Sequence, residues 1–370
     1  MVHRIHIKRV LPLLLPLIIV LVSVGISLLS RNVQEFADWY NQWIYPIFMN
    51  VIGRISNLIP FSLVELTLYG LILLIVSSII YAIYKIVKKQ RKVTEVLLGG
   101  VKKTSWLVAV LYLMFVLLCG INYHRTSFAT LYEFQDRAYT VEELEQISEL
   151  FVKRINEINE SRALGRLEDG TYTITRQDIV EAKLTLRNIG QTYPVLQGYY
   201  PNPKPLLFSE ILSYQQVSGI YVPFTVEANY NADMESYAIP FTVIHELAHV
   251  KGFMKEEEAN FISFLACTNS SNIKYEYSGY MYGYSYVIKE LRKMDQNAYQ
   301  RIIKLLGDEA NEDYRRGIKF WNQYKGAVAT ISTKVNDTYL KANAQPAGVK
   351  SYNHVVGLIT ASYKKNSIIH

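Results

Sequence analysis

A sequence of the form H-E-x-x-H stands past the middle of the chain and spaces two histidines and a glutamate for metal chemistry. His245 and His249 are four positions apart, and on a helix such residues lie on one face about one turn apart. Both imidazoles can therefore hold a single metal ion. Glu246 projects beside them, where its carboxylate can accept a proton from a water that Zn²⁺ has made acidic. We predict a hydrolytic zinc site in which Glu246 is the catalytic base.

A catalytic zinc site needs a third protein ligand and keeps a fourth position open. Three candidates follow the motif, namely Glu256, Glu257 and Glu258. On a helix that begins there, Glu256 shares one face with Asn260. We predict Glu256 as the third ligand beside the two histidines, and Asn260 as a hydrogen-bond partner of a ligating imidazole. Glu257 and Glu258 remain alternatives, and a solvated acidic helix start is the ordinary explanation of the run.

The segment around the motif has the composition of a buried helix. Pro240 suits a first helical turn, and Gly252 provides a stop soon after the second histidine. Apolar residues surround the three polar ones, and such an environment costs stability unless a partner satisfies them. A metal is one such partner. Residues 261–266 are again apolar and predict a second helix that packs back on the first.

A short strand is predicted directly before the metal helix, over residues 218–225. Pro223 would confine it to the edge of a sheet. Gly219, Tyr221 and Phe224 are candidates for main-chain pairing with an extended peptide substrate, and an ordinary edge strand explains them equally well. The polar residues that follow either line the cleft or form a turn; they are Glu227, Asn229 and Asn231.

Other polar side chains of the C-terminal half are weaker candidates. Six tyrosines crowd residues 275–286, and one hydroxyl near the metal could stabilise an oxyanion. Packing in the core or at a membrane interface accounts better for six of them. His354 is a second candidate oxyanion donor, with a surface or core histidine as the alternative. Cys267 is expected to be a small buried apolar residue.

The composition is that of a membrane protein. The 370 residues carry 39 Lys+Arg and 32 Asp+Glu, a formal charge of +7, and 50% are hydrophobic while only 19% are charged. Residues 10–29, 63–87 and 106–123 are apolar runs, each close to the ~20 residues that cross a bilayer as a helix. A cleaved signal peptide is the alternative for the first run. Two cysteines exclude a disulfide scaffold and a Cys-rich zinc knuckle.

The charges between these runs predict a multi-pass orientation, because basic segments stay in the cytoplasm. The N-terminal tail carries three basic residues, Arg4, Lys8 and Arg9. Seven more lie at the end of the second run and between it and the third, namely Lys85, Lys88, Lys89, Arg91, Lys92, Lys102 and Lys103. The loop of residues 30–62 carries aromatic residues that suit a membrane interface, Trp39, Tyr40, Trp43 and Tyr45. The N-terminus is therefore expected inside, with everything after residue 123 outside. The positive charge reflects this topology, and a nucleic-acid partner is not expected.

The chain is expected to divide into a membrane domain, residues 1–123, and one extracytoplasmic domain, residues 124–370, with its own core. Helical periodicity predicts helices over residues 141–160, with Leu150 on the apolar face, and over residues 178–189. The proline-rich residues 199–205 cannot be helical, and almost everything after Pro240 is expected to be helix. The predicted fold is thus three N-terminal transmembrane helices followed by a mainly α domain of the α+β kind.

The metal motif resembles that of gluzincin-type zinc metallopeptidases, in which a Glu on the next helix, in an E-x-x-A-D/N context, completes H-E-x-x-H. The run from Glu256 to Asn260 matches this context, with Asn where many such peptidases have Asp, and follows His249 more closely than is usual. The chain as a whole resembles a bacterial membrane family labelled domain of unknown function 3810, on residues 219–229, the H-E-x-x-H helix with Gly252, and residues 256–261. The resemblance implies a zincin-like fold and names no substrate.

These features favour a membrane-anchored zinc metallopeptidase of the bacterial cell membrane that cleaves extracytoplasmic peptides or proteins. Its partners would be the lipid bilayer and a peptide substrate. The alternative is a non-catalytic membrane sensor or assembly factor whose external domain is stabilised by zinc. A structural zinc site closes its fourth position with a protein side chain. No fourth ligand is obvious in the sequence, which favours catalysis.

Overall fold

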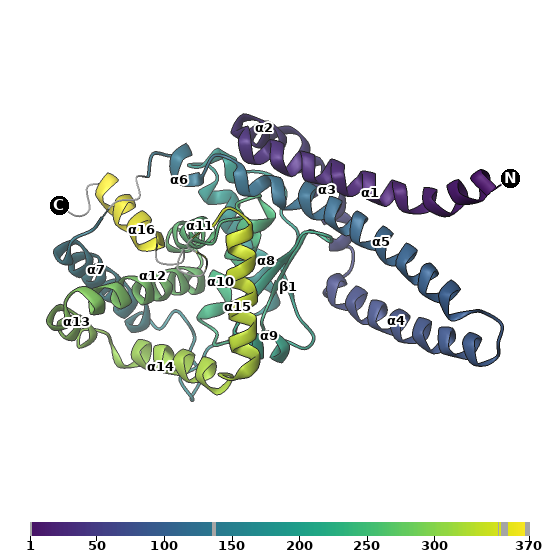
Figure 1. Cartoon of the computed structure of the whole chain (residues 1–370). Helices are drawn as coiled ribbons and strands as arrows, with labels where there is room; N and C mark the ends of the chain where they lie inside the picture. Colours follow the sequence, from purple (N-terminus) through teal and green to yellow (C-terminus); the bar gives the residue numbers. More distant parts are fainter. Residues whose placement is uncertain (1, 135–137, 347, 349–353, 367–370) are drawn as a thin grey trace.

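Three long helices project from one side of a larger helical body (Figure 1). The computed structural model describes residues 2–134, 138–346, 348 and 354–366, and only the backbone of residues 2–13. The projecting helices are α1 (Val2–Asn32), α4 (Leu63–Val87) and α5 (Val93–Leu118). Their segments Leu14–Asn32, Leu63–Val87 and Val93–Leu118 have mean hydropathies of 2.2, 2.3 and 1.7, and each is long enough to cross a bilayer. The chain therefore has the character of a membrane protein.

The bounds of the second predicted run are confirmed, whereas those of the third are wrong. Helix α5 begins at Val93 rather than at residue 106, so that Lys102 and Lys103 belong to the helix and not to the preceding loop. Lysine is a good helix former, so these two residues do not interrupt the helix. Helix α5 ends at Leu118 and is followed by the 3₁₀ turn η2 (Gly120–His124).

The segment that was expected to be a loop between the first two spans is helical. It consists of α2 (Gln34–Trp39), the π-helical turn η1 (Tyr40–Ile44) and α3 (Tyr45–Asn57). Trp39 and Trp43 are exposed as expected of interface residues, but Tyr40 and Tyr45 are buried. The prediction of four interfacial aromatic side chains is therefore wrong for these two tyrosines. Consecutive helical turns direct them towards the body of the protein instead.

Most of the helices predicted for the helical body are confirmed. Helix α7 (Val141–Glu160) has the predicted bounds and a capping box between Thr140 and Glu143. Helix α8 (Arg176–Ile189) begins two residues early because Thr175 caps it through Asp178. Leu150 was expected on the apolar face of α7, but its side chain is exposed. The remaining helices outside the site are α6 (Phe128–Leu131), η3 (Pro194–Leu196), α9 (Glu210–Gln215), α12 (Ile273–Met294), α13 (Gln296–Ile303), α14 (Asp308–Gln323), α15 (Ala327–Ala342) and α16 (His354–Lys365).

A small sheet of three strands lies beside the helices in the order β1-β3-β2. Strand β2 (Gly219–Val222) runs antiparallel to β3 (Glu227–Tyr230), and β1 (Lys204–Pro205) runs parallel to β3. Strand β2 is therefore an edge strand, as predicted. It is shorter than predicted, because Pro223 begins a turn and leaves Phe224 outside the strand. A proline cannot donate a hydrogen bond to continue the ladder.

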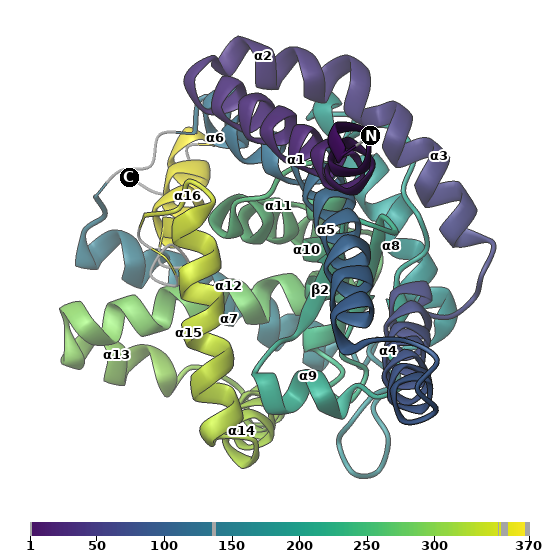
Figure 2. The ribbon, with the colours of Figure 1, turned by 45° about the vertical axis from the view of Figure 1, so that its right-hand side comes forward.

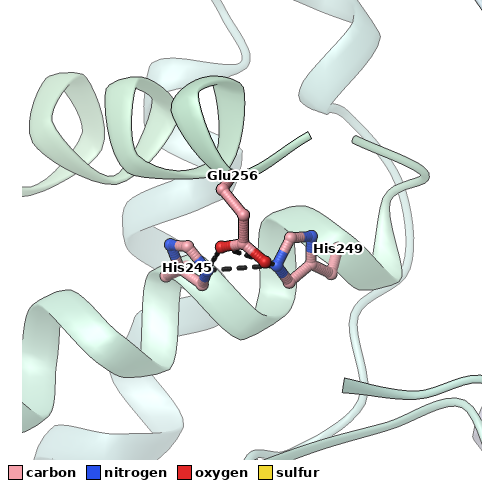
Figure 3. Close-up of side chains that lie close together, drawn as sticks. All are labelled: His245, His249 and Glu256. Atoms are coloured by element: carbon pink, nitrogen blue, oxygen red, sulfur yellow. Dashed lines mark hydrogen bonds and ion pairs between the residues drawn. The ribbon is translucent and has the colours of Figure 1, made fainter. Parts of the chain in front are cut away.

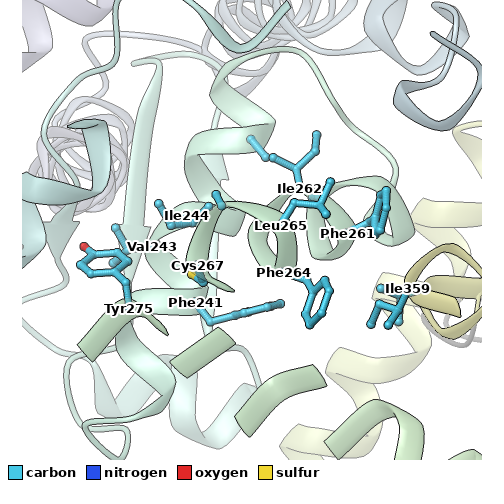
Figure 4. Close-up of a cluster of buried hydrophobic side chains, with 14 of the residues drawn as sticks. Phe241, Val243, Ile244, Phe261, Ile262, Phe264, Leu265, Cys267, Tyr275 and Ile359 are labelled. Atoms are coloured by element: carbon cyan, nitrogen blue, oxygen red, sulfur yellow. The ribbon is translucent and has the colours of Figure 1, made fainter. Parts of the chain in front are cut away.

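The hydrophobic core is continuous from the helices before α4 to the C-terminal helix. Figure 4 shows its centre, where Phe241 and Ile244 pack beside Phe261 and Phe264. Tyr275, Tyr277 and Tyr284 of the tyrosine-rich segment are buried in this core, as is Cys267. The same core includes residues that precede position 124, namely Ala37, Tyr40, Tyr45, Met49, Val116 and Ile121. The boundary between residues 123 and 124 stays a prediction, since the core extends across it.

Two buried carboxylates attach the first turn of α4 to the helical body. The carboxylate of Glu227 accepts hydrogen bonds from the backbone N–H groups of Leu63 and Val64, both at 3.0 Å. It also pairs with the buried ammonium of Lys204. The carboxylate of Glu65, on α4 itself, accepts from the backbone N–H of Leu207 at 2.7 Å. Glu227 was expected in a cleft or a turn, and it lies instead in β3 beneath the start of α4.

Candidate metal centre

The three predicted ligands lie together where α10 (Ala238–Val250) meets α11 (Glu256–Thr268) (Figure 3). Nε2 of His245 is 3.0 Å from Nε2 of His249 and 3.2 Å from Oε2 of Glu256, and Nε2 of His249 is 3.9 Å from that oxygen. One ligand atom of each residue lies within 4.8 Å of the others. Two atoms bound to a tetrahedral zinc at about 2.0–2.1 Å are about 3.4 Å apart, so this spacing suits such an ion.

The turn between the two helices brings Glu256 over the histidines. Gly252 has a φ of +88°, a conformation that glycine adopts without strain, and the chain reverses there after α10. Glu256 is the first residue of α11, where a carboxylate also suits the positive end of the helix dipole. The tight turn thus allows Glu256 to reach the histidines although it follows His249 closely in the sequence.

The outer nitrogens of both imidazoles have hydrogen-bond acceptors. Nδ1 of His249 lies 2.7 Å from the carbonyl oxygen of Phe253, which can only accept, so this nitrogen carries the hydrogen. Nδ1 of His245 lies 2.9 Å from Oδ1 of Asn260, the contact predicted for this asparagine. In their neutral form both rings therefore carry the lone pair on Nε2, and these two atoms lie 3.0 Å apart. A cation between these nitrogens and Oε2 of Glu256 would stabilise this arrangement, so the residues fit a zinc ion.

The pKa values of the two histidines are shifted in opposite directions. Burial lowers the pKa of His249 to about 4, and the neighbouring His245 adds to this shift. Burial also acts to lower the pKa of His245, but the hydrogen bond and charge of Glu256 outweigh it, and the pKa is raised. At neutral pH His249 is therefore neutral and can bind a metal, whereas Glu256 favours the protonated form of His245.

Glu246 points from α10 towards strand β2. In the antiparallel ladder Ser218 bonds to Asn231, so Gly219 and Tyr221 direct their backbone groups to the free edge. The backbone of Tyr221 hydrogen-bonds the Glu246 carboxylate. A Cβ atom on Gly219 would lie 2.5 Å from Oε1 of Glu246, so only glycine allows this approach. Of the three predicted edge residues, two border Glu246, and Phe224 lies in the turn.

The carboxylate of Glu246 is buried and has one oxygen, Oε2, with no hydrogen-bond partner among the described residues. Burial raises the pKa of this carboxyl to about 8, and the charge of Glu256 adds to the shift. A cation held by the three ligands would oppose this shift. Without such a cation, burial favours the protonated form of this carboxyl.

The other two glutamates of the run, Glu257 and Glu258, lie in different environments. Glu258 is buried, and its Oε1 accepts a hydrogen bond of 2.9 Å from the backbone N–H of Phe128. Burial raises the pKa of this carboxyl to about 7. Glu257 is partly buried, and burial also raises its pKa. Neither belongs to the cluster of three ligands, and the expectation of a solvated acidic helix start is wrong for Glu258.

The remaining candidates lie at the margin of the site or outside it. Tyr286 reaches the site indirectly, because its hydroxyl donates to Oδ1 of Asn260 at 3.1 Å. His354 begins α16 as an exposed residue. Sequence reasoning missed Gln345, whose side chain accepts from the backbone N–H of Glu256 at 3.3 Å, and Tyr45, whose hydroxyl donates to the carbonyl of Val250 at 2.8 Å. Only long-range packing brings these two residues here, and no local sequence pattern indicates them.

Comparison with known families places the chain in one of them. Residues 40–360 match the family described as protein of unknown function (DUF3810). The chain belongs to this family. The matched region contains α3, α4, α5 and the whole metal centre, so the resemblance expected from the sequence is confirmed for this family. No curated protein and no solved structure matches the chain, and membership in DUF3810 assigns no reaction.

Proposed function

We propose that this protein is a membrane-anchored, zinc-dependent metallopeptidase that cleaves peptides or proteins outside the cytoplasm. The observation that carries the proposal is the convergence of His245, His249 and Glu256, whose ligand atoms all lie within 4.8 Å of one another. The resemblance of this motif to that of the gluzincins supports the reaction class. The basic turn between α4 and α5, at the far end of the spans from the helical body, supports the extracytoplasmic location.

The side chains of the site divide the work of peptide hydrolysis. His245, His249 and Glu256 would hold the zinc ion, which when bound polarises a carbonyl group and lowers the pKa of water. Asn260 and the Phe253 carbonyl keep the two imidazoles in the tautomer that binds. Glu246 takes a proton from the attacking water and returns it to the nitrogen of the leaving amine. The buried setting of Glu246 keeps that proton from the solvent.

The second candidate function is a sensor or assembly factor with a structural zinc site. Such a site is closed by four protein ligands. Among the described residues the cluster contains three groups able to bind a metal, and Glu246 is not one of them. The side chains of His245 and Glu256 are also partly exposed, at 13% and 16%. Both observations favour an open catalytic position over a closed structural one.

The experiment that tests the proposal compares zinc content and hydrolysis in the purified full-length protein. We expect about one bound zinc per chain and hydrolysis of a peptide library, since sites of this kind hold one ion. Glu246→Gln should keep the zinc and lose hydrolysis by about 100-fold or more, which is the usual contribution of a general base. Glu256→Gln should lose zinc, whereas Glu257→Gln, the matched control in the same acidic run, should keep both zinc and activity.

Each other outcome has a definite meaning. Full hydrolysis by Glu246→Gln rejects this residue as the base. A zinc-containing wild type that hydrolyses nothing favours the sensor. A zinc-free wild type whose melting temperature ignores chelators rejects both functions.

A further inference from the structure

An exposed apolar stripe follows the helices that connect the first two spans. Trp39, Trp43, Ile47, Val51 and Ile55 recur every four residues along α2, η1 and α3, and each is 50% to 61% exposed. The opposite side of the same helices is buried in the core through Tyr40, Tyr45 and Met49. This segment joins the end of α1 to the start of α4, so it lies where two spans leave the bilayer on one side. Lipid is the natural cover for its outer stripe.

A second exposed apolar segment lies directly beside the start of α4. Leu207, Phe208 and Ile211, on or just before α9, are 62%, 58% and 50% exposed. The backbone N–H groups of Leu207 and Phe208 donate to the carboxylate of Glu65 in the first turn of α4, at 2.7 and 3.1 Å. The ring of Phe208 also packs edge-on against Tyr69 of α4, with 6.0 Å between centroids. These contacts hold the segment beside the first turns of α4.

A third apolar stripe lies on α15, which extends from the α9 segment to the end of α5. Val328, Ile331 and Val335 are 52%, 63% and 64% exposed and share one side of the helix. Helix α15 packs beside α9. Near its other end, the hydroxyl of Tyr339 lies 3.1 Å from that of Tyr123, just after α5, and its ring contacts Phe115 of α5. Both ends of α15 are thus attached next to a span, so the helix runs along the membrane side of the body.

We call these three segments together the apolar ring. In Figure 2 they surround the ends of the spans. We propose that the apolar ring rests in the interface of the lipid bilayer, so that the helical body lies on the membrane with its metal centre on the membrane-facing side. A soluble body attached to the membrane only through its spans would not need three exposed apolar stripes around the ends of those spans. Continuity with the spans identifies the occupant as lipid rather than a second protein.

The metal centre is attached to the same membrane-facing elements. The chain just after its second histidine is bound to Tyr45 of α3, through the carbonyl of Val250 at 2.8 Å. Met254 contacts Cys119 at the end of α5, with 3.7 Å between the sulfur atoms. Gln345, shortly after α15, accepts from the backbone N–H of Glu256. If the protein is the proposed peptidase, its substrates are then polypeptide segments held near the bilayer by their own membrane anchors.

Lipid contact is measured on the full-length protein in lipid nanodiscs with variants that each carry one added cysteine. Both native cysteines, Cys119 and Cys267, are buried and do not compete for a polarity-sensitive fluorophore. Ile211→Cys and Ile331→Cys labels should be quenched by nitroxide-bearing lipids and protected from iodide in the water, like a label at Ile55→Cys. The matched control is Leu305→Cys, because Leu305 is 51% exposed but follows α13, on the far side of the body (Figure 1). This label should be quenched by iodide alone.

Two results would overturn the docking surface. Labels on α9 and α15 that respond to iodide as Leu305→Cys does would show that these faces are in water. Labels that respond to neither quencher would show that a second copy or another protein covers them.

The substrate class is tested separately with one peptide, either free or joined to an acyl chain through Gly/Ser spacers of increasing length. Wild-type protein in nanodiscs should cleave the short-spacer peptide fastest and the long-spacer peptide more slowly, since a longer spacer holds the peptide farther from the bilayer. Equal rates at all spacer lengths reject membrane-proximal substrates. No cleavage of any peptide, by a protein that binds zinc and passes the quenching test, rejects the peptidase and leaves the docking surface intact.

Discussion

At the residue scale, the hydrogen bonds on the outer side of the two imidazoles decide the chemistry. Asn260 and the Phe253 carbonyl hold His245 and His249 so that both Nε2 atoms face Glu256. A histidine without such a partner would be free to rotate or to change its tautomer. The H-E-x-x-H spacing alone does not ensure this orientation. The site is therefore preorganised by neighbours as much as by its ligands.

The raised pKa of His245 predicts a pH dependence of zinc affinity. Glu256 raises the pKa of His245, whereas the pKa of His249 is lowered to about 4. A metal must displace the proton from His245, so zinc affinity should fall as the pH drops through the raised pKa of His245. Competition with a chromophoric chelator between about pH 5 and 8, where histidines titrate, measures this fall. An affinity that is constant over this range would contradict the prediction.

The close approach of β2 to the proposed base predicts the effect of one methyl group. In Gly219→Ala the new Cβ would lie 2.5 Å from Oε1 of Glu246, so the carboxylate must move. We expect unchanged zinc content and a loss of hydrolysis of about 10- to 100-fold, as displacements near 1 Å cause in active sites. Gly326→Ala is the control, because a Cβ there meets no atom within 4 Å. Loss of zinc, or full activity, in Gly219→Ala would refute this account of the glycine.

At the element scale, the small sheet connects the start of α4 to the metal centre. Strand β3 holds the start of α4 through Glu227, and it also pairs with β2, whose edge borders Glu246. The spans and the metal centre thus share one short strand as a common support. The buried carboxylate of Glu227 binds the sheet to α4. Removal of a partner of a buried charge lowers stability strongly, because water cannot replace that partner.

This support predicts a large loss of stability when the buried pair is broken. The side chains of Lys204 and Glu227 are 3% and 1% exposed. Glu227→Gln leaves the ammonium of Lys204 without its counter-charge and should cost about 3–5 kcal/mol. Glu290→Gln is the control, because its partner Lys293 is 58% exposed and the loss should stay below about 1 kcal/mol. Thermal unfolding in one lipid environment compares the two, and equal melting temperatures would disprove the importance of the buried pair.

At the scale of the whole molecule, the membrane helices and the helical body form one structure. Core residues from α2–α3 and the end of α5 pack into the same cluster as α10 and α11. The body is therefore not a separate globule joined by a linker. This packing fixes the position of the body relative to the spans.

The predicted orientation is tested by the accessibility of cysteines from outside intact cells. Gln90 lies in the exposed turn between α4 and α5, and Asn322 lies exposed near the end of α14. Asn322→Cys should react with a membrane-impermeant maleimide in intact cells, and Gln90→Cys only after the cells are permeabilised. The wild type, with both cysteines buried, provides the background. The reverse pattern of labelling would place the metal centre in the cytoplasm.

Local patterns in the sequence determined the spans, several helices and the core of the metal motif. A run of apolar residues, a capping box and a pair of histidines four positions apart act within one or two helical turns, and so they can be read without a fold. For this reason the bounds of α4 and α7 agree with the prediction. The same reasoning placed His245 and His249 on one face.

Only the tertiary structure decided which side chains complete the site and which support it. Glu256 and Glu258 are two positions apart on one helix, yet the first faces the histidines and the second binds the backbone of Phe128. Glu227, Tyr45 and Gln345 acquire their partners from segments far away in the chain. Such contacts depend on how helices pack in three dimensions, and a single sequence carries no local signal for them.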